Sequence, residues 1–203
     1  SSIWILCGSG NNGGDGLALA WYLGTQSPLI TSPKNQLKVF LHQDGPKTQA
    51  GQFYWQCCQK SDIPMLTLMD FLHEDWPGET LMIDALLGTG VEGPLRDPYL
   101  SVLTKLARHK ARVISLDIPS GPQIVPEAIY SFGVGKLSVA LDPLSPSSKV
   151  KILPMGFPSY LMEKVADKAV TAKVPIPLSW EKEPRLISSF IKEKHQHKYQ
   201  SGS

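Results

Sequence analysis

Short apolar runs recur along the chain, and most of them end in polar or glycine-rich sequence. They predict buried strands at six places, which are residues 3–7, 37–41, 82–83, 113–116, 137–141 and 150–153. Apolar residues at helical spacing predict helices over residues 15–23, 48–60 and 98–109, with Asp15 at the N-terminus of the first. Because strands alternate with helices, we expect an α/β domain with a mostly parallel sheet covered on both faces.

Composition and charge narrow the class of protein. The 203 residues carry a formal net charge of +2, and 42% of them are apolar, which is ordinary for one globular domain with a short extra piece. The positive excess lies within residues 181–198, so the body of the chain lacks the basic stripe that nucleic-acid binding requires. No apolar run approaches the roughly 18 residues of a membrane span, and no signal-peptide pattern opens the chain.

The ends of the chain and its cysteines add three expectations. The chain begins Ser-Ser without an initiator Met, so we expect an N-terminally truncated piece of a longer protein. Residues 173–184 are punctuated by prolines and are typical of a linker. Three scattered cysteines, Cys7, Cys57 and Cys58, form no C-x-x-C motif, which indicates a reducing compartment such as the cytoplasm.

Three glycine-bearing loops follow predicted strands and carry the functional signal. They span residues 8–16, 84–96 and 117–121. In open α/β sheets, ligands bind beyond the carboxyl ends of the strands. We therefore expect the three loops to border one crevice, although each loop alone is a weak signal.

The first loop, Gly8-Ser9-Gly10-Asn11-Asn12-Gly13, has the G-x-G-x-x-G spacing of a phosphate-binding turn. Such glycines let backbone N–H groups point at an anion beside a helix N-terminus, but a plain strand-to-helix turn has the same spacing. A dinucleotide fingerprint also needs an acidic residue about 20 positions on, and the nearest candidate, Asp44, comes 36 positions after the first glycine. Since the side-chain oxygens of Asn11, Asn12 and Asp15 can coordinate a hard cation, we predict a phosphate-and-cation loop.

Four further side chains are candidates for the crevice. Asp84 and Asp117 each follow an apolar run, where a carboxylate points into the crevice and suits chemistry or cation binding; a turn or helix cap is the alternative for each. Ser120 offers a hydroxyl oxygen or is a turn residue. Lys47 faces the same crevice or is a solvated surface lysine, and the sequence alone favours the second interpretation.

Three segments, CGSGNNGGDGLALA, DALLGTGVEGPLRDP and SLDIPSG, resemble in sequence, order and spacing the signatures of the YjeF N-terminal domain family, the NAD(P)HX epimerases. The resemblance is specific over residues 3–121 and looser to about residue 170. It implies a Rossmann-like three-layer αβα sandwich and a potassium-dependent isomerase. The implied reaction interconverts the R and S forms of NADHX or NADPHX, the hydrated, damaged nicotinamide cofactors. A partner dehydratase, which takes only the S form, then restores them.

The resemblance also implies roles for individual residues. Asp117 would contact the substrate near the reacting ring and is the candidate acid or base, and Lys47 matches a lysine that family members carry after the second strand. A potassium ion would be bound by Asn12, Asp84 and Ser120. The substrate would be held by Asp117 and by two stretches, which are Asn11, Asn12, Gly13, Gly14 and Asp15 in the first loop and Gly88, Thr89, Gly90, Val91, Glu92, Gly93 and Pro94 in the second.

The chain departs from the family pattern at both ends. Family members carry helices before the first strand that are not present here, and the segment after Gly121 is short and altered. The last residues resemble the entry to the dehydratase domain that many bacterial members carry behind the epimerase. We therefore expect an epimerase domain over residues 1–172, followed over residues 173–203 by a linker and the start of a dehydratase domain. Assembly into a homo-oligomer stays open.

Two other functions remain open. A non-catalytic binding or scaffold module shares this fold, but the presence of Asn12, Asp84, Asp117 and Ser120 favours an enzyme. An ordinary nicotinamide-dependent oxidoreductase is disfavoured, because the acidic residue of its fingerprint is missing. We expect neither nucleic acid nor a membrane as a partner.

Overall fold

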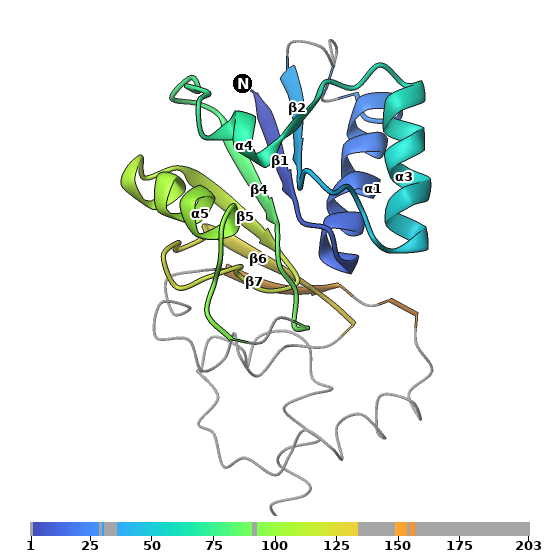
Figure 1. Ribbon diagram of the computed structural model, residues 1–203. Helices are drawn as coiled ribbons and strands as arrows, with labels where there is room; N and C mark the ends of the chain where they lie inside the picture. The colour runs from blue at the N-terminus through green and yellow to red at the C-terminus, as the bar shows by residue number, and fades with distance from the viewer. Residues whose placement is uncertain are drawn as a thin grey trace, which may run out of the picture.

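The apolar runs form the inner strands of a seven-stranded sheet in the computed structural model (Figure 1). The structure describes residues 2–28, 30, 36–90, 93–133, 149–153 and 155–156. Its strands are β1 (Ile3–Cys7), β2 (Leu37–Leu41), β3 (Met65–Thr67), β4 (Leu81–Ala85), β5 (Arg112–Leu116), β6 (Ala128–Phe132) and β7 (Lys149–Leu153). Its helices are α1 (Asn11–Thr25), α3 (Gln49–Lys60), α4 (Leu68–Phe71) and α5 (Tyr99–Arg108).

The strand order places a reversal of the chain at the centre of the sheet. The strands lie in the order β3-β2-β1-β4-β5-β6-β7, and each described pair is parallel. Strand β1 pairs with β2 on one side and with the central β4 on the other, so that Ile5 lies between Val39 and Ile83. The chain runs outward from β1 to β3 and then returns to begin β4. Ligands of open α/β sheets bind at such a reversal, beyond the carboxyl ends of the strands.

Each face of the sheet has its own apolar core, because alternate residues of a strand point to opposite faces. On β1, Ile5 and Cys7 pack in the core beneath α1 and α3, whereas Trp4 and Leu6 pack in the core beneath α4 and α5. Figure 1 shows α1 and α3 together on one side of the sheet and α4 and α5 on the other. The expected three-layer αβα sandwich is confirmed.

Lys105 of α5 forms hydrogen bonds that hold the end of α4 and the segment after it. Its ammonium group donates hydrogen bonds to the backbone carbonyl oxygens of Phe71 at 3.0 Å and Leu72 at 2.9 Å, and also to that of Glu74. The same group lies 5.3 Å from the ring centroids of Phe71 and Trp76. The Phe71 carbonyl also accepts from the Glu74 N–H at 3.2 Å, so Lys105 adds a charged donor to carbonyl groups at and beyond the end of α4.

We expect Lys105→Met to lower the free energy of unfolding by about 2 kcal/mol, because partly buried carbonyl groups lose a charged donor. Urea unfolding followed by circular dichroism measures this loss. Arg108→Met is the matched control: it removes an exposed positive charge from the same last turn of α5 and should change stability by less than about 0.5 kcal/mol. Equal losses in the two variants would show that charge at the helix end matters rather than the carbonyl contacts.

Most of the predicted strands are confirmed. Residues 3–7, 37–41 and 113–116 lie in β1, β2 and β5, residues 82–83 lie in β4, and residues 150–153 lie in β7. The strand predicted at 137–141 and the domain boundary at residue 172 lie outside the described residues. Three short elements, β3, α4 and β6, are not among the sequence predictions. Within the described part of the chain, no helix is long and apolar enough to cross a membrane.

The prediction that the first helix begins at Asp15 is wrong, because α1 begins at Asn11. Glycine disfavours helix by about 1 kcal/mol per residue relative to alanine, so the glycine-rich start of α1 does not look helical in the sequence. Tertiary contacts require a glycine there nevertheless, since a Cβ atom on Gly13 would lie 1.8 Å from the carbonyl oxygen of Gly8. Asp15 therefore lies in the second turn of α1 and does not cap the helix.

Candidate functional site

The turn after β1 leads directly into the N-terminus of α1. The backbone N–H of Gly8 donates to the carbonyl oxygen of Ala85 at 3.0 Å, which holds this turn against the end of β4. Gly10 precedes α1 in an extended conformation and supplies no side-chain cap, and the first turn contains no acidic residue. The first N–H groups of a helix have no partner within the helix, so this end of α1 is suited to an anion such as phosphate.

Asn12, in the first turn of α1, joins three segments of the chain. Its side chain is buried, and its Nδ2 donates to the carbonyl oxygens of Leu87 at 2.8 Å and Leu116 at 3.1 Å. Leu87 follows β4 and Leu116 ends β5. The Asn12 Oδ1 atom is also buried, and no described residue donates a hydrogen bond to it. A buried amide oxygen without a partner costs free energy, and a cation ligated by this oxygen would remove that cost.

Asp84, the fourth residue of β4, is fully buried. Its Oδ2 accepts hydrogen bonds from the Ser115 hydroxyl at 2.8 Å and the Ser120 N–H at 2.9 Å, and its Oδ1 accepts from the Ser120 hydroxyl and the Leu86 N–H. Burial raises the pKa of Asp84 above its usual range, and these hydrogen bonds act in the opposite direction. The expectation that this carboxylate points into an open crevice is wrong, because the protein encloses it.

Leu87 links Asp84, Ser120 and Asn12 into one network. The Ser120 hydroxyl donates to Asp84 and accepts a hydrogen bond of 2.9 Å from the Leu87 N–H. The carbonyl oxygen of Leu87 accepts from Asn12, as described above. The structure thus brings together the three side chains predicted to bind potassium, although they come from α1, β4 and the loop after β5. Their binding of an ion stays a prediction.

The chemistry of this network fits a hard monovalent cation. It offers the unpartnered Oδ1 of Asn12 and the carboxylate of Asp84, and oxygen ligands of this kind suit hard cations. The groups that donate to Asp84 are all uncharged, so none of them would neutralise the charge of the ionised carboxylate. The described residues contain no cluster of three or more His, Cys, Asp or Glu side chains, and Asn12 and Ser120 are the neutral candidates beside the Asp84 carboxylate. The Ser120 hydroxyl already positions Asp84.

Potassium is therefore expected to stabilise the folded chain. At a concentration ten times its dissociation constant, a ligand that binds only the folded state adds about 1.4 kcal/mol, which corresponds to a rise in Tm of several degrees. Thermal unfolding in KCl and in choline chloride at equal ionic strength measures the difference. Asp84→Asn should abolish it, whereas Asp62→Asn, at an exposed position after α3, should retain it. The same Tm in both salts for the unsubstituted chain would contradict the potassium site.

Asp117 directly follows β5 and has a left-handed backbone conformation, with φ of 64°. Its N–H donates to the Tyr130 carbonyl at 2.7 Å, its carbonyl accepts from the Ser131 hydroxyl at 2.7 Å, and its Oδ1 accepts from the Phe132 N–H at 3.5 Å. Strand β6 therefore holds Asp117 in a conformation that costs a non-glycine residue on the order of 1 kcal/mol. Residues held in this way cluster at functional sites.

Asp15 lies one helical turn beyond Asn12 and is close enough to Asp117 for the two carboxylates to repel each other. Loss of water around Asp15 raises its pKa, and the negative charge of Asp117 raises it further. Two neighbouring carboxyl groups can act as a proton donor beside a proton acceptor. The arrangement is therefore suited to acid–base chemistry at the edge of the crevice.

The remaining candidates lie around this centre. The backbone N–H of Lys47 donates to the Ser9 carbonyl at 2.8 Å, which holds the turn after β2 beside the turn after β1, and the Lys47 side chain is exposed. A Cβ atom on Gly88 would lie 3.5 Å from the Cβ of Asn12. Four further residues of that loop are exposed, namely Thr89, Gly90, Gly93 and Pro94, while Val91 and Glu92 lie outside the described residues. Substrate contacts of this loop stay predictions.

Two serines that position the acidic residues are not among the candidates predicted from the sequence. Ser115 donates to Asp84, and Ser131 donates to the carbonyl oxygen of Asp117. Both serines are fully buried, and each is a polar residue within an apolar strand. Because a buried hydroxyl group needs a hydrogen-bond partner, a serine inside an apolar run is the signal that would have identified them.

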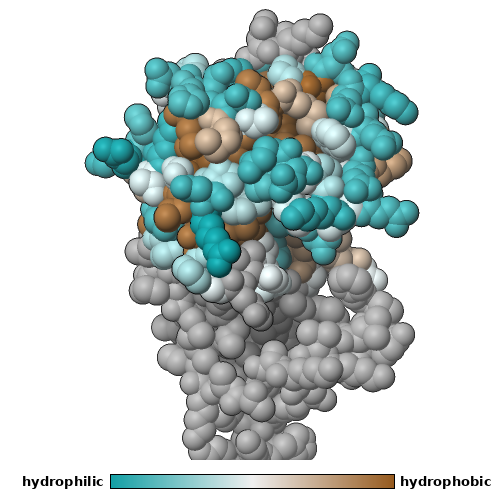
Figure 2. Space-filling view, viewed as in Figure 1, coloured by the Kyte–Doolittle hydropathy of each residue, from teal (hydrophilic) through white to brown (hydrophobic). Residues whose placement is uncertain are grey.

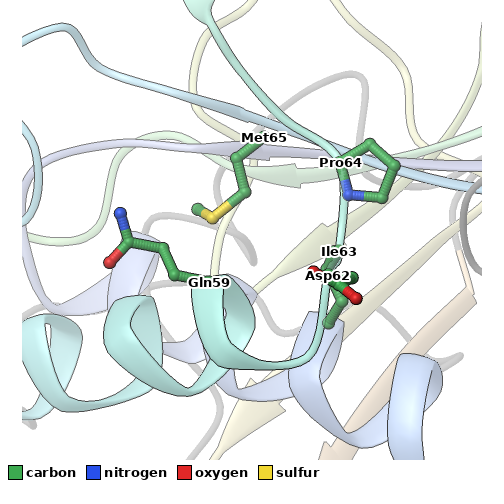
Figure 3. A pocket seen from close by; sticks show the side chains of 5 residues that line it. All are labelled: Gln59, Asp62, Ile63, Pro64 and Met65. Atoms are coloured by element: carbon green, nitrogen blue, oxygen red, sulfur yellow. The ribbon is translucent and has the colours of Figure 1, made fainter.

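A hollow of about 530 Å³ lies where the chain leaves α3 and enters β3 (Figure 3). It is lined by Gln59, Asp62, Ile63, Pro64 and Met65. Since β3 begins at Met65, this hollow lies at the amino end of a strand, whereas the site described above lies at carboxyl ends. None of the candidate residues lines it, so it is separate from the candidate site.

Comparison with known proteins assigns the chain to a family. Residues 1–131 match the family described as YjeF-related protein N-terminus. The chain is 35% identical over 135 residues to the bifunctional NAD(P)H-hydrate repair enzyme Nnr of Methanospirillum hungatei. It is 31% identical over 132 residues to the NAD(P)H-hydrate epimerase of Schizosaccharomyces pombe, and 34% identical over 122 residues to Nnr of Coxiella burnetii.

These matches cover 64%, 61% and 59% of this chain but 26%, 49% and 22% of the relatives, so the chain spans half or less of their length. The crystal structure of yeast ynu0, YNL200c, has a TM-score of 0.62 to this fold at 20% sequence identity, over 87% of this chain and 74% of the yeast chain. That likeness supports the fold. Because the family match extends over well more than half of its residues, the chain belongs to the family of YjeF-related proteins and carries their N-terminal domain.

Proposed function

We propose that this chain is an isomerase that interconverts the R and S forms of NADHX and NADPHX and depends on potassium. The network that joins Asn12, Asp84 and Ser120 through Leu87, beside the carboxyl pair of Asp15 and Asp117, is the observation that carries the proposal. The names of the relatives, an NAD(P)H-hydrate epimerase and two NAD(P)H-hydrate repair enzymes, support it. The N-terminus of α1 offers a place for the substrate pyrophosphate.

Epimerisation requires the C6 hydroxyl group to leave the hydrated ring and return on the other face. The C6–O bond breaks and its electron pair leaves with the oxygen, which takes a proton from an acid and departs as water. The ring nitrogen shares its lone pair with C6 and becomes positively charged. Water then adds to the opposite face of C6 and gives a proton to a base, while the electron pair returns to the nitrogen. Protons and electrons therefore balance over the cycle.

The carboxyl pair suits both proton transfers. Asp15, whose pKa is raised by desolvation and by its neighbour, is the proposed proton donor to the departing hydroxyl. The Asp117 carboxylate stabilises the positively charged ring and accepts the proton of the returning water. That proton then passes back to Asp15, directly or through water, which restores the pair for the next turnover. The strained backbone of Asp117 fixes the direction of this carboxylate before the substrate arrives.

Phosphate and potassium binding hold the substrate for this step. The pyrophosphate lies against the first N–H groups of α1, and the exposed Lys47 adds positive charge beside that turn. Asn12, Asp84 and Ser120 would hold the potassium ion, whose positive charge would neutralise the buried carboxylate. Those three residues in turn hold the loops that border the crevice in fixed positions relative to one another.

A dehydratase that takes the S form is the partner that this reaction serves. Two of the relatives are named as bifunctional repair enzymes, which favours a dehydratase fused behind residues 1–172 over a separate protein. The cytoplasm, where reduced nicotinamide cofactors and free thiols coexist, is the proposed compartment.

Exchange between separated epimers tests the proposal. The full chain is incubated with pure (R)-NADPHX or (S)-NADPHX, and the approach to the equilibrium mixture is followed by reversed-phase chromatography. We expect rapid exchange in KCl and loss of most of the rate in choline chloride at equal ionic strength. Asp62→Asn, remote from the site, should keep the rate of the unsubstituted chain. Binding of NADPHX without any exchange would favour the non-catalytic binding module.

A further inference from the structure

Asp44 lies in the turn after β2, and hydrogen bonds at both ends of this turn hold it against the turn after β1. The backbone N–H of His42 donates to the Cys7 carbonyl at 3.1 Å, and that of Lys47 donates to the Ser9 carbonyl at 2.8 Å. Ser9 comes just before Gly10, the residue that precedes α1. These bonds therefore keep Asp44 close to the N-terminus of α1.

The ring of His42 supports this turn and lies beside the Asp44 carboxyl group. Its Nδ1 accepts a hydrogen bond of 3.2 Å from the Asp44 N–H and lies 3.6 Å from the Asp44 Oδ2. The ring also stacks on Tyr99, the first residue of α5, with 5.4 Å between the ring centroids. The His42 side chain is only 12% exposed, whereas that of Asp44 is 60% exposed. The turn thus presents one carboxyl group to solvent on a largely buried support.

The strand topology shows why the position of Asp44 matters. In dinucleotide-binding sheets, the pyrophosphate lies at the N-terminus of the first helix, and an acidic residue at the end of the second strand binds a ribose 2′-hydroxyl group. Strand β2 pairs with β1 and ends at Leu41, so Asp44 follows the end of the corresponding strand. Its separation of 36 positions from Gly8 includes the connection between α1 and β2, residues 26–36. That connection lengthens the spacing along the chain but does not change where β2 ends.

The surroundings of the turn suit a polar ligand. Helix α3 begins shortly after the turn, and hydrophilic residues line the margin of the molecule that this helix forms (Figure 2). Asp44 and Lys47 are both exposed. A carboxylate and an ammonium group act in opposite directions on a phosphate, so these two residues can treat different phosphates of one ligand differently.

We propose that Asp44 binds the 2′-hydroxyl group of the adenosine ribose and repels a 2′-phosphate, so that the chain prefers NADHX to NADPHX. The inference rests on the proposed function and adds the choice between its two substrates. Because the ribose is joined to the pyrophosphate through its 5′ carbon, a pyrophosphate at the N-terminus of α1 brings the 2′ position towards the turn after β2. A carboxylate accepts a hydrogen bond from a hydroxyl group, but a phosphate carries charge of the same sign. Asp44 is thus a specificity-determining residue and takes no part in the chemistry at C6.

The exposure of Asp44 limits the size of the preference. Water and salt screen the interaction between exposed charges, so we expect a KM for NADHX that is about five- to tenfold lower than that for NADPHX, with similar kcat values. The preference should decrease when choline chloride is added at constant KCl, because the repulsion is electrostatic. A preference that came from the shape of the site alone would not respond to salt in this way.

Initial rates of epimer exchange with NADHX and with NADPHX test the proposal through the ratio of the two kcat/KM values. Asp44→Asn should bring this ratio to within about twofold of unity, mainly by lowering the KM for NADPHX, because the amide carries no charge but still accepts a hydrogen bond. Lys47→Met should instead raise both KM values together, since the pyrophosphate is common to both substrates. Asp62→Asn removes an exposed carboxyl group after α3 and should keep the ratio of the unsubstituted chain.

Binding of ADP-ribose and of its 2′-phosphate, measured by isothermal titration calorimetry, gives a readout that does not require exchange. The unsubstituted chain should bind ADP-ribose about five- to tenfold more tightly, and Asp44→Asn should lose most of this difference. Exchange without discrimination, or an Asp44→Asn variant that keeps the ratio or weakens both substrates equally, would overturn the inference and leave the epimerase proposal standing. A binding preference that depends on Asp44 in a chain without exchange would overturn the epimerase proposal alone. Neither binding nor exchange would overturn both.

Discussion

Asp117→Asn is expected to slow epimer exchange by about 10²–10⁴-fold, which is the range that a positioned acid or base contributes. The amide keeps the shape of the side chain but cannot accept a proton or stabilise a positively charged ring. Folding should be retained, because asparagine is among the residues that tolerate the left-handed backbone of this position best. Exchange rates from chromatography and the Tm of the same preparation separate the two effects.

The effect of Asp117→Asn can also be measured through the pKa of Asp15. Desolvation is the larger cause of its raised pKa and the charge of Asp117 the smaller, so Asp117→Asn should lower this pKa only part of the way to its usual value. Carboxyl carbon resonances followed by NMR measure the change. In the unsubstituted chain, exchange should slow as pH rises through the pKa of Asp15, because the proton donor is lost. A normal rate in Asp117→Asn would remove this residue from the chemistry, whereas an unchanged pKa of Asp15 would separate the two carboxylates.

The sequence predicts the inner part of the sheet well, because continuous apolar runs report burial on both faces. The run at residues 3–7 coincides with β1, and residues 82–83 lie within β4. Strand β3 and helix α4 have only three and four residues, which is too short to show any period. Their position depends on tertiary contacts instead, such as those that Lys105 makes with the end of α4. No local pattern contains that information.

The candidate site is also only partly predictable from the sequence. The rule that ligands bind beyond the carboxyl ends of parallel strands leads from sequence to the loops that hold Asn12, Asp84 and Ser120. This rule does not say which side-chain oxygen accepts hydrogen bonds and which has no donor. That Asp84 is enclosed by hydroxyl and N–H donors, while the Oδ1 of Asn12 stays without a partner among the described residues, follows from side-chain packing. Fold topology can thus be inferred from pattern, whereas the state of each polar atom requires coordinates.

Gly13→Ala is expected to destabilise the fold by at least about 3 kcal/mol, against a total of about 5–15 kcal/mol for a typical domain. Alanine in place of glycine inside a helix ordinarily gains about 1 kcal/mol, so helix propensity alone predicts the opposite sign. The added Cβ would lie 1.8 Å from the carbonyl oxygen of Gly8 and 2.6 Å from its carbonyl carbon. Both are backbone atoms, and Gly8 is itself held by its hydrogen bond to Ala85. The helix or the turn must move.

Gly10→Ala provides the matched control for this substitution. It adds the same methyl group three residues earlier in the same segment, where no atom lies within 4 Å of the new Cβ. Its stability should change by less than about 1 kcal/mol, because an alanine before a helix is only moderately unfavourable. Urea unfolding of both variants measures the difference. Equal stabilities would mean that the first turn of α1 can shift away from the turn after β1. The same turn could then not hold Asn12 in fixed contact with the loops after β4 and β5, and the candidate cation site would lose its rigid support.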